Sequence, residues 1–132
     1  GEGPEKAWAR HALTARTMRA GVKAMGLTLW AAREEIASPT CTAIRTPKGI
    51  DEAALRREAR ARYGVMFSGG FGDTIGKLTR IGHMGNTAQP IHAVTALAAC
   101  GGALTALGHR CDTGKAIEAA LAVIGNDRGE HA

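Results

Sequence analysis

Four stretches of the chain place apolar residues three and four positions apart, which is the period of an amphipathic helix. The first opens at Pro4, a favoured residue of the first helical turn, and ends near Gly26. The second is bounded by Asp51, a good N-cap, and by Gly64, a typical C′ residue. The pattern therefore predicts helices over about residues 4–25, 52–63, 90–107 and 113–124.

Short apolar and β-branched segments lie between these helices and predict strands over about residues 27–30, 40–45, 65–67 and 78–83. The second strand, the helix after it and the third strand should form a right-handed βαβ crossover. The predicted fold class is α+β, with a small mixed β-sheet of about four strands and helices packed mainly on one face. In the last helix Thr113 is the expected cap and Gly125 the expected stop, which leaves residues 126–132 as a disordered tail.

Composition limits the class of protein. A chain of 132 residues with 45% hydrophobic residues is the size of one globular domain. It contains no apolar run of the roughly 18–20 residues that a membrane span needs. Its first residues are acidic and lack the apolar core of a secretory signal. We therefore expect a cytoplasmic protein that does not associate with membranes.

Charge and cysteine content exclude two further classes. The net charge of +5 could attract nucleic acid, but the basic residues are spread along helices among acidic neighbours, so no nucleic-acid partner is predicted. Cys41, Cys100 and Cys111 contain no CxxC motif and are expected to be free thiols. His109 with Cys111 could form half of a metal site, but no second pair stands at ligand spacing, so no metal is predicted.

The glycine-rich stretch over residues 68–85, SGGFGDTIGKLTRIGHMG, carries the candidate chemistry. It is not a P-loop, because Phe71 occupies the first glycine position and Leu78 the hydroxyl position. It is not a dinucleotide fingerprint either, because Ile75 stands at the third glycine. Two interpretations of Arg80 then remain: a surface cation beside glycines that merely permit positive φ, or a clamp for a carboxylate.

The same stretch resembles the C-terminal signature of class V, fold-type I aminotransferases of the alanine–glyoxylate and serine–pyruvate group. The resemblance extends over nearly the whole chain: residues 2–27 resemble the helix that enters the small domain of this family. The segment SPTCTAIRTPKGID, over residues 38–51, resembles its first strand pair and turn. The pyridoxamine-using members are the most similar. We therefore expect residues 1–125 to be the C-terminal small domain, with residues 1–25 as its first helix.

The resemblance implies roles for single residues. Arg80 matches the arginine that binds the α-carboxylate of the amino- or keto-acid substrate in this family. Phe71 and His83 are lesser candidates, and His83 is read more readily as structural. Pyridoxamine-using members are expected to place an arginine where this chain has Phe71, which argues against pyridoxamine as the amino donor.

In this family the pyridoxal phosphate (PLP) cofactor, its Schiff-base lysine and the residues that bind its phosphate belong to a large domain, which would precede Gly1 and is absent from the chain. Lys77 does not match the cofactor lysine, so no cofactor and no catalytic residue are expected here and the chain alone should be inactive. The implied reaction moves an amino group from an amino acid or pyridoxamine to pyruvate or glyoxylate. The implied partners are the large domain and the second subunit of a homodimer. A free-standing domain that binds small carboxylates or another protein is the alternative.

Overall fold

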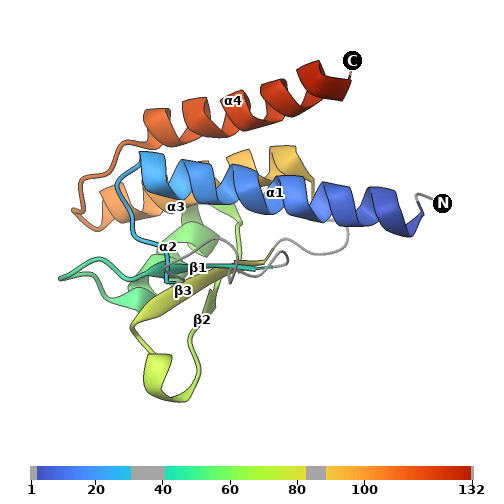
Figure 1. The fold of residues 1–132 in the computed structure, drawn as a ribbon. Coiled ribbons are helices and arrows are strands. Elements are labelled where there is room, and N and C mark those ends of the chain that lie inside the picture. Colours follow the sequence, from blue (N-terminus) through green and yellow to red (C-terminus); the bar gives the residue numbers. More distant parts are fainter. Residues whose placement is uncertain (1–2, 31–40, 83–88, 132) are drawn as a thin grey trace.

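The computed structural model describes residues 3–30, 41–82 and 89–131, with the side chains of residues 130 and 131 left out (Figure 1). Three long helices form one layer, and a small sheet lies beneath it (Figure 1). In chain order the elements are α1 (Pro4–Ala24), β1 (Cys41–Arg45), α2 (Glu52–Tyr63), β2 (Ser68–Gly69), the short 3-10 turn η2 (Gly72–Thr74), β3 (Leu78–Gly82), α3 (Pro90–Ala106) and α4 (Thr113–His131). The α+β class with helices on one face is confirmed.

The described sheet has three strands in the order β1-β3-β2. β3 pairs antiparallel with both neighbours, so the prediction of a mixed sheet of about four strands needs correction. β1 and β2 run parallel to each other but do not touch, because β3 inserts between them. The predicted crossover through α2 therefore joins two outer strands across a central one.

Of two further predicted strands, one is reduced to a single bridge and the other is absent. Of residues 27–30 only Leu29 pairs, in a single bridge with Ile44. Residues 65–67 form no strand: the Val65 amide donates to the Ala59 carbonyl at the end of α2, and the chain then descends to the sheet. Leu27 and Phe67 in these segments are buried in the core instead. Thr40, at the start of another predicted strand, lies outside the described residues.

Helix ends follow local chemistry where it is strong. The Asp51 side chain accepts from the Ala53 amide and Gly64 adopts φ 68°, so both predicted ends of α2 are confirmed. At the start of α4 the carboxylate of Asp112 accepts from the Lys115 amide at 3.0 Å, so Asp112 caps the helix in place of Thr113. The predicted stop at Gly125 is wrong, because α4 runs on to His131 and residues 126–131 are helical rather than a disordered tail.

The core lies between the helices and one face of the sheet, and small residues let the helices approach closely. A Cβ at Gly21 in α1 would overlap Leu97 of α3, and one at Gly101 in α3 would overlap Thr113 of α4. The sequence marked the glycine pair of α3 as weak helix formers that need close packing, and the structure confirms that packing. None of the described helices is both long enough and apolar enough to cross a membrane.

The sheet has one covered and one helix-free face. Successive side chains of a strand point to opposite faces. Thr79 bonds to Glu52 of α2 and Ile81 joins the main apolar core, so both face the helices. Arg80 between them must face the other way. The β2–β3 connection, which includes η2, projects from the sheet away from the helical layer (Figure 1).

Candidate carboxylate-binding site

Arg80 occupies the middle of the central strand on the helix-free face. Its neighbours across the sheet are Ala43 of β1 and Ser68 of β2. A central strand is fixed from both sides by ladder hydrogen bonds, so the backbone beneath Arg80 is held by two neighbours. The side chain itself is half-buried.

Two groups fix the guanidinium. Its Nε–H donates to the Gly69 carbonyl at 2.8 Å, and its Cζ lies 4.1 Å from the centre of the Phe71 ring. Among the described residues no carboxylate forms an ion pair with Arg80. Within the described part of the chain its two terminal nitrogens have no ion-pair partner, and a planar guanidinium can give a carboxylate two parallel hydrogen bonds.

The loop that carries Phe71 is internally bonded. The Phe71 amide donates to the Thr74 hydroxyl, which donates in turn to the Phe71 carbonyl. Both hydrogen bonds are 2.8 Å long. A Cβ at Gly70 would overlap the backbone carbonyl of Thr74, so this turn requires glycine. The interpretation that glycines here merely permit positive φ holds for Gly72 and Gly76, at 51° and 80°, but not for Gly70.

A buried carboxylate supports the other side of the site. Glu52 is 3% exposed and accepts from Arg56 Nε at 2.7 Å and from the Thr79 hydroxyl at 3.3 Å. A Cβ at Gly69 would stand 2.9 Å from Glu52 Oε1, so a larger residue here would have to displace that carboxylate oxygen. Glu52 is bonded to Thr79, the β3 partner of Gly69, whose carbonyl holds Arg80. The sequence did not predict this role, because nothing local distinguishes Glu52 from a solvated helix residue.

A second arginine shares the helix-free face. Arg45 pairs with Leu78 at the end of β1, and its Cζ lies 4.4 Å from the Trp30 ring. Unlike Arg80, its side chain is exposed and stands at a strand end. Of the two, Arg80 has the geometry of a pre-formed anion site.

Cys41 and Cys100 occupy contrasting environments. Burial raises the pKa of Cys41, and the nearby charge of Arg80 opposes this rise. Burial raises the pKa of Cys100, deep in α3, to about 12, so that thiol is inert near neutral pH. The described cysteines are free, and the described residues contain no group of three or more metal-ligating side chains.

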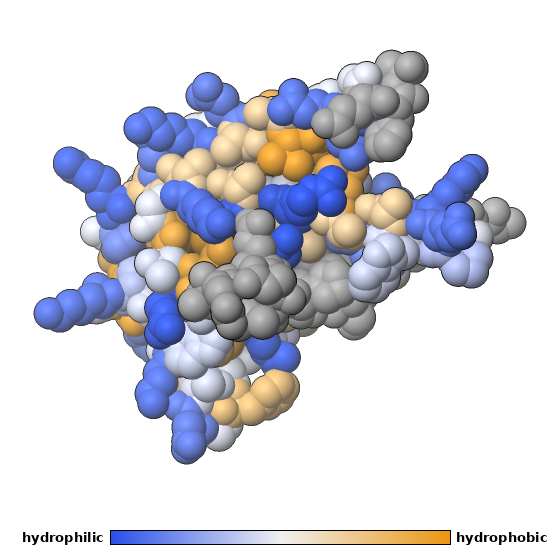
Figure 2. Space-filling model, in the orientation of Figure 1, coloured by the Kyte–Doolittle hydropathy of each residue, from blue (hydrophilic) through white to orange (hydrophobic). Residues whose placement is uncertain are grey.

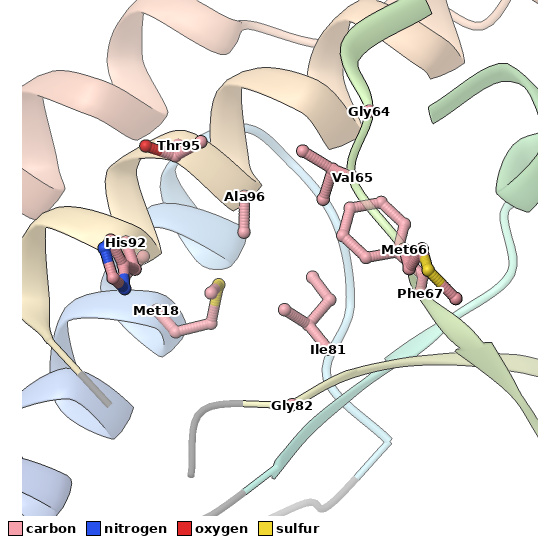
Figure 3. Close-up of a pocket in the computed structure, with 11 residues that line it drawn as sticks. Met18, Gly64, Val65, Met66, Phe67, Ile81, Gly82, His92, Thr95 and Ala96 are labelled. Carbon is pink, nitrogen blue, oxygen red and sulfur yellow. The ribbon is translucent and has the colours of Figure 1, made fainter. Parts of the chain in front are cut away.

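A cavity of about 380 Å³ lies beside Ile81, which points to the covered face of the sheet (Figure 3). Side chains from α1, α3 and β3 surround it, among them Met18, Ala96 and Ile81. The described residues that line it include no Asp, Glu, Lys or Arg, and His92 and Thr95 are the polar side chains among them. It does not contain Phe71 or Arg80, so it is not the predicted carboxylate site. His83, the third candidate, lies outside the described residues.

Comparison with known proteins agrees with the resemblance read from the sequence. No protein-family model matches the chain. Over 126 residues it is 69% identical to pyridoxamine–pyruvate transaminase of Mesorhizobium japonicum, covering 96% of this chain and 32% of that protein. The crystal structure of pyridoxamine–pyruvate aminotransferase from Mesorhizobium loti superposes with a TM-score of 0.94 at 69% identity. The superposition covers 96% of this chain and 32% of that one. Ureidoglycine–glyoxylate aminotransferase of Bacillus subtilis superposes with a TM-score of 0.88 at 33% identity, over 94% of this chain and 32% of that one.

These likenesses in sequence and fold place the chain among the class V, fold-type I aminotransferases. Within that group it is similar to the pyridoxamine–pyruvate enzyme, and it spans about a third of the length of its curated relatives.

Aminotransferases of this family use PLP, which is held through a lysine Schiff base in a closed site. The described residues do not fit that group. All lysines of the chain lie on the exposed surface, namely Lys6, Lys23, Lys48, Lys77 and Lys115. None of them is buried as the lysine of such a Schiff base would be.

Proposed function

We propose that this chain is the C-terminal small domain of a PLP-dependent aminotransferase and that Arg80 binds the substrate α-carboxylate. The carrying observation is the Arg80 guanidinium, which is fixed by Gly69 and Phe71 and has no carboxylate partner among the described residues. A carboxylate bound there through two hydrogen bonds would have its α-carbon oriented relative to the strand.

The relatives supply the class of reaction. Their names describe amino transfer to pyruvate or glyoxylate, and we extend this to the protein that contains the present chain. The cofactor, its lysine and the catalytic steps on it belong, in this proposal, to the rest of the protein. This domain binds and orients the substrate and does not transaminate alone. The partners are a PLP-binding large domain and the second subunit of a homodimer.

The donor stays open between an amino acid and pyridoxamine. High identity to a pyridoxamine–pyruvate enzyme favours pyridoxamine, whereas Phe71 stands where an arginine is expected in pyridoxamine-using members. Steady-state kinetics of the full-length protein with pyridoxamine and with L-alanine as donors would decide between them.

The carboxylate site is tested by the affinity for pyruvate. Isothermal titration of the full-length protein at fixed ionic strength should show pyruvate binding that Arg80→Ala weakens about ten- to a hundredfold, because charged hydrogen bonds contribute roughly 1.5–3 kcal/mol. Arg45→Ala is the matched control, since Arg45 lies on the same face and also stacks on a ring. Equal affinity of the Arg80→Ala and unmutated proteins would overturn the proposal.

The alternative is a free-standing domain that binds small carboxylates or another protein, and the gene distinguishes it from the proposed function. If the proposed function is right, the coding sequence upstream of Gly1 should contain, in frame, a domain with the cofactor lysine. A start codon shortly before the codon of Gly1, with no such domain in frame, would favour the alternative.

A further inference from the structure

Phe71 is an apolar residue in an unusual position. The residue is 71% exposed in the β2–β3 connection, and Ile75 in the same loop is 69% exposed. Figure 2 shows apolar surface at the foot of the view, where this loop lies in Figure 1. Single exposed apolar residues are common, so exposure alone assigns no role.

The backbone of Phe71 is nevertheless held by hydrogen bonds at both its amide and its carbonyl. Thr74 bonds to both its amide and its carbonyl, and Gly70 leaves room for this close turn. This backbone conformation places the Phe71 ring against the guanidinium of Arg80, whose Cζ lies 4.1 Å from the centre of the ring. The loop therefore holds a ring over a cation and buries little of that ring.

This contact limits how Arg80 can move. The Gly69 carbonyl fixes the guanidinium at Nε, and the ring of Phe71 covers one of its faces. A free arginine side chain loses much rotamer freedom when it binds a ligand, and a pre-positioned one loses less. The attraction of a cation to the face of a ring adds to this ordering.

We propose that Phe71 is a positioning residue for substrate binding, which acts by holding the Arg80 guanidinium with its terminal nitrogens turned to the carboxylate. This inference rests on the proposed function, because it takes Arg80 as the carboxylate-binding residue. It assigns Phe71 a role through its aromatic face rather than through direct contact with substrate.

The test distinguishes the effect of the aromatic face of Phe71 from the effect of the size of its side chain. In the full-length protein, Phe71→Leu keeps an apolar side chain of similar size without a π face, whereas Phe71→Tyr keeps the face. Calorimetric titration with pyruvate should give an affinity reduced about three- to tenfold for Phe71→Leu and restored for Phe71→Tyr. Ile75→Ala, in the same loop and equally exposed, should bind pyruvate like the unmutated protein.

Outcomes distinguish this inference from the proposed function. If Arg80→Ala abolishes pyruvate binding while Phe71→Leu binds normally, Arg80 holds the carboxylate but the positioning role is wrong. The same conclusion follows if Phe71→Tyr is as weak as Phe71→Leu. If Arg80→Ala itself has no effect, the proposed function fails first. The thermal midpoint of the Phe71 variants should match that of the unmutated protein, since the ring lies largely in solvent.

Discussion

The two faces of the small sheet are built for different tasks. The covered face presents Thr79 and Ile81 to helices whose contacts are made by buried alanine, leucine and glycine. The helix-free face presents Arg45 and Arg80, each stacked on an aromatic ring. One strand, β3, supplies side chains to both.

The difference separates stability from binding. Burial of apolar surface on the covered face contributes most of the folding free energy, because few residues of the other face leave water completely. An arginine on the helix-free face can therefore change without loss of the fold. Substitutions on the two faces should give opposite patterns of effect on unfolding and on ligand affinity.

The largest expected effect on stability comes from the apolar core that lies over the covered face. Leu97 of α3 is 0% exposed and contacts α1 at Gly21, so Leu97→Ala should lower the free energy of unfolding by about 2–5 kcal/mol. Urea denaturation followed by circular dichroism measures this change. Ile91→Ala, on the same helix with a side chain 58% exposed, is the control and should cost much less. A loss below about 1 kcal/mol for Leu97→Ala would break the contrast between the faces.

A smaller loss of stability is expected at Glu52, which links α2 to the sheet. Glu52→Ala removes the acceptor of Arg56 and Thr79 beneath Gly69, and should destabilise the fold by about 1–3 kcal/mol. Denaturant titration measures it. Glu58→Ala provides a matched control, since Glu58 also bonds an arginine four residues on in the same helix but lies nearer the surface, so its loss should change the free energy of unfolding much less.

The smallest effect has the opposite sign and lies far from the sheet. Nothing lies within 4 Å of a Cβ built at Gly125, and α4 continues through this residue. Gly125→Ala should therefore raise the free energy of unfolding by roughly 0.5–1 kcal/mol, through helix propensity alone. Thermal unfolding checks the sign. No stabilisation would indicate that the helix ends near Gly125, as its glycine first suggested.

Sequence predicted the elements whose signals are local. The ends of α2 were correct because Asp51 and Gly64 act within one turn of the helix. The role of Arg80 came from resemblance, and its place on a strand from the β-like pattern around it. Strand pairing was predicted less well, since β1, one of the two partners of β3, is distant in sequence and no local signal specifies the strand order.

The residues that hold the backbone around Arg80 could not all be predicted from the sequence, for a similar reason. Glu52 lies 27 positions before Thr79, and their hydrogen bond exists only after α2 packs on the sheet. Thr74, by contrast, left a usable signal: a threonine three residues after Phe71 can bond back to its backbone. Phe71 was singled out, but as a missing arginine rather than as a partner of Arg80.

The position of β3 has a consequence for how the protein is made. It is the last of the three described strands to leave the ribosome, yet it occupies the centre of the sheet. Until it arrives, β1 has only the bridge from Leu29 to Ile44, and β2 has no described strand to pair with. The residue proposed to hold the substrate is thus carried on the strand that completes the sheet. A nascent chain that ends before Leu78 would lack both the central strand and Arg80, so the proposed carboxylate site cannot form before the described sheet is complete.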